Sequence, residues 1–113
     1  MTLSTHVLDT GRGRPAAGVP VRLDRHDGET WRPVAEAETD GDGRLGGLLQ
    51  PGTEPGGAGT YRLRFGTGPY FAAAGAETFY PEVSVVFVIT DPAEHHHVPL
   101  LISPYGYTTY RGS

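Results

Sequence analysis

The chain contains neither cysteine nor lysine among its 113 residues. The lack of cysteine excludes disulfide bonds and thiol catalysis, and the lack of lysine excludes a Schiff base on a lysine side chain. Nine arginines stand against thirteen acidic residues, which gives a formal net charge of -4. This acidic balance argues against a nucleic-acid partner.

Targeting and membrane-spanning segments are also missing from the sequence. Residues 1–20 contain no basic stretch followed by an apolar stretch, which a secretory signal would require. No run of residues approaches the roughly 20 apolar positions that a membrane span needs. We therefore expect no contact with a membrane and a location in the cytoplasm.

Glycine and proline are plentiful, with 17 and 10 copies, and they favour short strands and turns over long helices. Apolar and polar residues alternate in several segments, which predicts strands over residues 3–10, 19–24, 31–39, 45–49, 60–65 and 82–89. A loop is expected over 50–59 and one short helix over 68–75. The length suits one domain over residues 1–113, and the strand pattern indicates an antiparallel β-sandwich.

The last nineteen residues, HHHVPLLISPYGYTTYRGS, carry most of the candidate chemistry. This segment is too aromatic and too rich in β-formers for a disordered tail, so it predicts two strands joined at Ser103-Pro104. Side chains alternate between the two faces of a strand. His95 and His97 should therefore share one face, with His96 on the other.

The residues alone leave several kinds of site open. His95 and His97 could bind a metal together with His6, or the imidazoles could act without a metal as acids and bases. Ser113 could be a nucleophile, but the sequence has no G-x-S-x-G motif, so we favour a role in binding or positioning. Arg44 directly follows a tight turn and is a candidate for a positively charged residue of the site. These residues indicate a histidine-arginine site without naming its substrate.

Three motifs together resemble those of one family. The chain opens with LSTHVLD at residues 3–9 and GRPA at 13–16, has Gly43-Arg44 in its middle, and closes with HHHVPLL at 95–101 and YRGS at 110–113. These motifs are similar to those of the 5-hydroxyisourate hydrolases, the transthyretin-related enzymes of urate breakdown. The resemblance covers essentially the whole chain. Its most specific part is YRGS, which transthyretin itself, the hormone carrier, lacks.

The resemblance implies a fold, an assembly and an activity. The fold would be a transthyretin-like antiparallel β-sandwich of two four-stranded sheets with one short helix. Four chains would form a homotetramer, a dimer of dimers, with active sites at the dimer-dimer interface. The reaction would be hydrolysis of a small-molecule substrate, 5-hydroxyisourate, whose cyclic amide opens to give 2-oxo-4-hydroxy-4-carboxy-5-ureidoimidazoline. No cofactor would take part.

The resemblance also implies which residues act. Catalysis falls on His6, Arg44 and His97. Substrate binding falls on Tyr110, Arg111, Gly112 and Ser113. One departure is visible, because His96 stands where the family usually has tyrosine.

Our hypothesis for the chemistry is that His6 and His97 orient and deprotonate a water molecule, while Arg44 polarises the carbonyl. Two alternatives remain at this point. One is a transthyretin-type protein that binds a small ligand without catalysis. The other is a zinc-dependent hydrolase that uses His6, His95 and His97.

Overall fold

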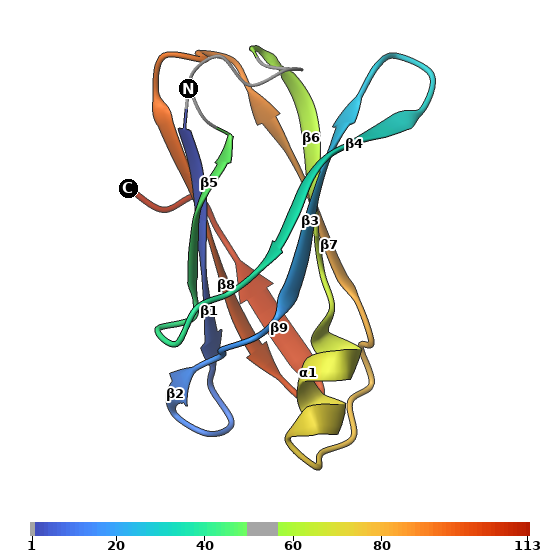
Figure 1. The fold of residues 1–113 in the computed structure, drawn as a ribbon, viewed down its shortest axis with the longest axis vertical. Coiled ribbons are helices and arrows are strands. Elements are labelled where there is room, and N and C mark those ends of the chain that lie inside the picture. Colours follow the sequence, from blue (N-terminus) through green and yellow to red (C-terminus); the bar gives the residue numbers. More distant parts are fainter. Residues whose placement is uncertain (1, 50–56) are drawn as a thin grey trace.

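Two β-sheets pack face to face in the computed structural model, which describes residues 2–49 and 57–113 (Figure 1). The first sheet contains β1 (Thr2–Asp9), β2 (Arg14–Pro15), β5 (Arg44–Leu49), β8 (His95–Ser103) and β9 (Gly106–Thr109). The second sheet contains β3 (Pro20–His26), β4 (Trp31–Glu38), β6 (Gly59–Phe65) and β7 (Val83–Ile89). The predicted sandwich with one short helix is confirmed.

The first sheet differs from the prediction in two details. It has five strands, because β2 and β5 pair one after the other along the same edge of β1, while β8 occupies the opposite edge. In addition, β1 and β8 run parallel rather than antiparallel. Between β1 and β8 the chain forms β2 and β5 of the first sheet and all four strands of the second sheet. Such a long connection is what a parallel pair requires.

Each sheet buries one face in the core and turns its other face outward. Along β1, buried residues alternate with half-buried ones, so Leu3 and Val7 lie in the core whereas Ser4 and His6 lie on the outer face. The same alternation in β8 buries Leu100 and Ile102. The apolar positions thus orient the strands, and the histidines that the sequence singled out are carried to the outside.

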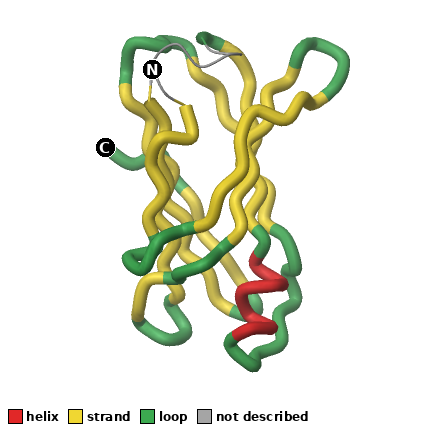
Figure 2. Tube along the Cα trace, viewed as in Figure 1, coloured by secondary structure: helices red, strands yellow, loops and turns green. Residues whose placement is uncertain are grey.

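The helix α1 (Thr67–Ala73) lies at one end of the sandwich (Figure 2). It starts one residue before the predicted 68–75 and ends before Gly75. Its buried Tyr70 donates a hydrogen bond of 2.8 Å to the buried carboxylate of Asp9, which joins the helix to β1.

No helix in the described ranges is long and apolar enough to cross a membrane. Most of the predicted 50–59 loop lies outside the described residues.

The turn between β4 and β5 docks on β1 through Gly43. This residue has a φ of 74°, and its carbonyl oxygen accepts a 2.7 Å hydrogen bond from the Val7 N–H. A Cβ added at Gly43 would lie 2.3 Å from the Val7 carbonyl oxygen. Only glycine therefore fits at this position.

We expect Gly43→Ala to lower the free energy of unfolding by more than about 2 kcal/mol, because a left-handed conformation and a backbone clash act together. Urea unfolding followed by circular dichroism measures the change. The matched control is Gly41→Ala in the same turn, where a Cβ meets nothing within 4 Å. Equal stability of the two variants would contradict the close docking of this turn.

Candidate active site

Three neighbouring strands bring the predicted catalytic residues to one face. In the register of the first sheet, Arg44 of β5 pairs with His6 of β1, and Ser4 of β1 pairs with His97 of β8. One level further, Thr2 pairs with His95. Paired residues of adjacent strands point to the same side of a sheet. The guanidinium and the imidazoles therefore share the outer face of the first sheet.

The turn before β5 fixes both Arg44 and His6. The carboxylate of Asp40 accepts hydrogen bonds from the backbone N–H groups of Asp42, at 2.9 Å, and Arg44, at 3.0 Å. These bonds hold the pKa of the Asp40 carboxyl below its ordinary value. The Nε2 of His6 donates to the carbonyl oxygen of Asp42 at 2.9 Å. Because a carbonyl can only accept, the neutral His6 ring keeps its free lone pair on Nδ1.

His97 is held in place by Ser4. The Ser4 hydroxyl lies 2.8 Å from Nδ1 of His97. The pKa of His97 is lowered from its ordinary value, first because the ring is partly buried and then because His6 and His95 add positive charge nearby. An interaction with the backbone of Ser4 acts in the opposite direction and raises the pKa, and Arg44 adds to the lowering. At neutral pH the ring is therefore uncharged and can accept a proton.

The closing segment packs directly against His97. The N–H of Gly112 donates to the carbonyl oxygen of His97 at 2.8 Å, beyond the end of β9. A Cβ at Gly112 would lie 2.5 Å from Cδ2 of the His97 ring and 3.1 Å from Cγ of Pro99. The glycine of the YRGS motif thus lets the chain end cross the imidazole, with Tyr110 and Ser113 exposed on either side of it.

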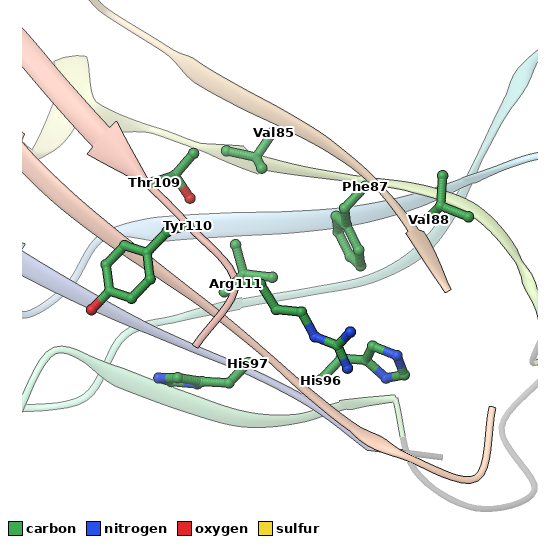
Figure 3. A pocket seen from close by; sticks show the side chains of 9 residues that line it. Val85, Phe87, Val88, His96, His97, Thr109, Tyr110 and Arg111 are labelled. Atoms are coloured by element: carbon green, nitrogen blue, oxygen red, sulfur yellow. The ribbon is translucent and has the colours of Figure 1, made fainter. Parts of the chain in front are cut away.

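The Arg111 side chain is directed differently from the His97 ring. Arg111 lines a cavity of about 220 Å³ together with His96, His97 and Tyr110. Its guanidinium bonds to the carboxylate of Glu94 at 2.9 Å. In Figure 3 the Arg111 side chain points toward His96, whereas the His97 ring points away from it. The structure therefore brings His6, His97 and Arg44 to one face, with Gly112 packed on His97, but it does not bring the Arg111 guanidinium to them.

His96 occupies the inner face, as strand alternation predicts. It is buried, and its Nδ1 has no hydrogen-bond partner within the described residues. This ring therefore belongs to the interior of the sandwich and does not join the outer-face histidines.

Sequence reasoning missed two groups that hold the predicted catalytic side chains. One is Ser4, and the other is the carbonyl oxygen of Asp42. Ser4 stands two residues before His6, so alternation already places it on the same face. Its contact with His97 needs the parallel pairing of β1 and β8, for which the sequence carries no local signal.

The arrangement combines a proton acceptor with a nearby cation. A neutral imidazole can take a proton from water, and the neighbouring guanidinium can stabilise an oxygen on which negative charge develops. Over residues 2–49 and 57–113, no three His, Asp or Glu side chains are grouped as metal ligands would be. The imidazoles of His95 and His97 instead share a hydrogen bond to the hydroxyl of Ser4.

Comparison with known proteins agrees with the motifs. A model of the HIUase/Transthyretin family matches residues 3–112. The 5-hydroxyisourate hydrolase of Mus musculus is 49% identical, over 98% of this chain and 94% of that protein. The structure of the Klebsiella pneumoniae 5-hydroxyisourate hydrolase is 43% identical, with a TM-score of 0.85 over 99% of this chain and 98% of the other. The transthyretin structure from Sparus aurata is 31% identical, with a TM-score of 0.88 over 97% and 95%. The predicted transthyretin-like fold is thereby confirmed.

The environment of His97 predicts a measurable titration. We expect the His97 ring to titrate below the ordinary histidine value of 6.5, and nuclear magnetic resonance of the ring protons measures this. In His6→Asn the pKa of His97 should rise, because one source of positive charge is removed. A wild-type midpoint at or above 6.5, or a fall in the variant, would contradict this electrostatic account.

Proposed function

The chain belongs to the HIUase/Transthyretin family, and from this premise we propose that it hydrolyses 5-hydroxyisourate. The cyclic amide of the substrate would open to give 2-oxo-4-hydroxy-4-carboxy-5-ureidoimidazoline. The observation that carries the proposal is the shared face of His6, His97 and Arg44. The identity to the two hydrolases is higher than the identity to transthyretin, which favours an enzyme over a carrier.

We propose His97 as the general base. Its Nδ1 is engaged by Ser4 and its pKa is lowered, so Nε2 can take a proton from a water molecule. His6, whose Nε2 is bonded to Asp42, would orient the same water through Nδ1. The water attacks the amide carbonyl, and Arg44 stabilises the negative charge that develops on the carbonyl oxygen. The proton on His97 then passes to the leaving nitrogen, and no cofactor is needed.

The closing segment supplies the substrate-binding residues of the proposal. Tyr110 and Ser113 are exposed beside the packed Gly112 and can reach a molecule held against His97. We give Arg111 an anchoring role, because its ion pair with Glu94 holds the segment that carries its neighbours.

We further propose that residues 1–113 act as one domain and that four chains assemble as a dimer of dimers. The edge strands β7 and β9 support a dimer, since β7 exposes Val86 and Val88, and β9 exposes Tyr107. An exposed apolar edge strand offers unpaired N–H and C=O groups to which another chain can add. Sites at the dimer-dimer interface would be formed by the outer face of the first sheet. Light scattering of the purified protein tests this assembly.

The location in the cytoplasm stays a prediction.

The function is tested by making 5-hydroxyisourate in place from urate with a urate oxidase and following its ultraviolet absorbance. We expect the protein to accelerate the decay well above the spontaneous rate. His97→Asn and Arg44→Gln should each lower kcat by roughly 100-fold or more, since one removes the base and the other the charge stabilisation.

Matched controls lie in the second sheet. His26→Asn and Arg22→Gln make the same chemical changes in β3, which lies between β4 and β6 of the second sheet, and should keep kcat within about twofold of the wild type. A folded wild-type protein without acceleration would remove the hydrolase proposal. Equal losses in the controls would remove the assigned site.

The packing of Gly112 on His97 gives a separate prediction. Gly112→Ala should lower kcat by about tenfold or more, because the added methyl group displaces the imidazole or the chain end. The control is Gly106→Ala in the same hairpin, where the nearest atom, Oγ of Ser103, is 3.6 Å from an added Cβ. Unchanged kcat in Gly112→Ala would show that the chain end does not set the position of His97.

A further inference from the structure

A continuous chain of hydrogen bonds runs along the outer face beyond His97. The hydroxyl of Ser4 lies 2.8 Å from Nδ1 of His97 and 3.0 Å from Nε2 of His95. The other nitrogen of the His95 ring, Nδ1, is hydrogen-bonded to the hydroxyl of Thr2. Four side chains from two strands are therefore linked in the order His97, Ser4, His95, Thr2.

The strand pairing explains why these groups meet. In the parallel register Thr2 pairs with His95 and Ser4 pairs with His97, so the four side chains form two adjacent levels on one face. Ser4 is short, and its hydroxyl can lie between the two imidazoles. The series of hydrogen bonds begins at the His97 ring, which is the proposed base, and ends at the exposed contact between His95 and Thr2.

The hydroxyl of Ser4 couples the two rings, because it has one hydrogen to donate. In one arrangement His97 Nδ1–H donates to Ser4, Ser4 donates to His95 Nε2, and His97 Nε2 keeps its lone pair. In the reverse arrangement His95 Nε2–H donates to Ser4, Ser4 donates to His97 Nδ1, and the proton of His97 lies on Nε2. The tautomer of one histidine therefore fixes the tautomer of the other.

We propose that Ser4 and His95 form a proton relay that sets the tautomer of His97 and holds, on His95, the proton that His97 removes from water. This inference rests on the proposed hydrolase function. Ser4 and His95 are positioning residues here, because they act through His97.

The proton movements balance. When His97 Nε2 accepts a proton from water, its Nδ1 proton passes to the oxygen of Ser4, and the Ser4 proton passes to His95 Nε2. The positive charge then lies on His95, which carries protons on both nitrogens. For the second half of the reaction, His95 Nε2 returns its proton to Ser4, the Ser4 hydroxyl proton passes to His97 Nδ1, and His97 gives its Nε2 proton to the leaving nitrogen. No proton is gained or lost over the cycle.

The relay would move positive charge away from His6 and Arg44. His97 lies one level from His6 and Arg44, and both disfavour a positive charge on its ring. His95 is two residues further along β8, or about 7 Å at the usual rise of a strand. A proton held on His95 is therefore farther from Arg44, which remains free to stabilise the negative oxygen of the substrate.

The coupling itself can be tested without substrate. We expect ¹⁵N resonances of His97 to report one dominant neutral tautomer in the wild type and a mixture in Ser4→Ala. Ser4→Thr keeps the hydroxyl and should behave like the wild type. Ser84→Ala, an exposed serine of β7, is the matched control. The same tautomer in wild type and Ser4→Ala would overturn the coupling.

The relay is tested in the hydrolysis assay. Ser4→Ala and His95→Ala should lower kcat by about tenfold or more while KM changes less than about twofold. Added imidazole should restore kcat in His95→Ala, whereas pyrazole, which has a similar shape but is a far weaker base, should not. A purely structural role of His95 would not distinguish these two compounds.

The outcomes separate the relay from the function on which it rests. A folded wild-type protein that does not accelerate decay overturns the proposed function and the catalytic use of the relay with it. An active wild type whose kcat survives both Ser4→Ala and His95→Ala overturns the relay alone. Equal rescue by imidazole and pyrazole also overturns it.

Discussion

Eight consecutive residues of β1 pair in parallel with eight residues of β8, from Thr2 opposite His95 to Asp9 opposite Ile102. The buried side chains hold this register, because a slip by one residue would turn every side chain to the other face. Leu3 and Leu100 are fully buried, and each contributes about 2 kcal/mol through removal from water. The inner face therefore determines which residues meet on the outer face.

The outer face gains its chemistry from short polar contacts rather than from a deep pocket. A turn capped by Asp40 directs a carbonyl oxygen to His6 and starts β5 at Arg44. Ser4 holds His97, and nearby positive charges lower the pKa of that ring. The same charges make a protonated His97 costly, so a base in this position benefits from neighbours that share its proton.

Local pattern predicted much of the fold and part of the site. Alternation along the strands placed His97 outside and His96 inside, because the period of a strand is local. The parallel pairing of β1 with β8 could not be predicted, since it depends on the path of the intervening residues through the second sheet. For the same reason the contact of Ser4 with His97 was missed. Arg111 bonds to the exposed carboxylate of Glu94, a partner that no motif spacing indicates.

The pH dependence of kcat/KM for 5-hydroxyisourate tests the central claim most directly, because it reports the ionisation of the essential base in the free enzyme. If neutral His97 is that base, activity should fall on the acid side with a midpoint below 6.5 that matches the pKa of the His97 ring. A rate that stays constant through this titration, or a midpoint that does not follow the ring when His6 is replaced, would contradict the account.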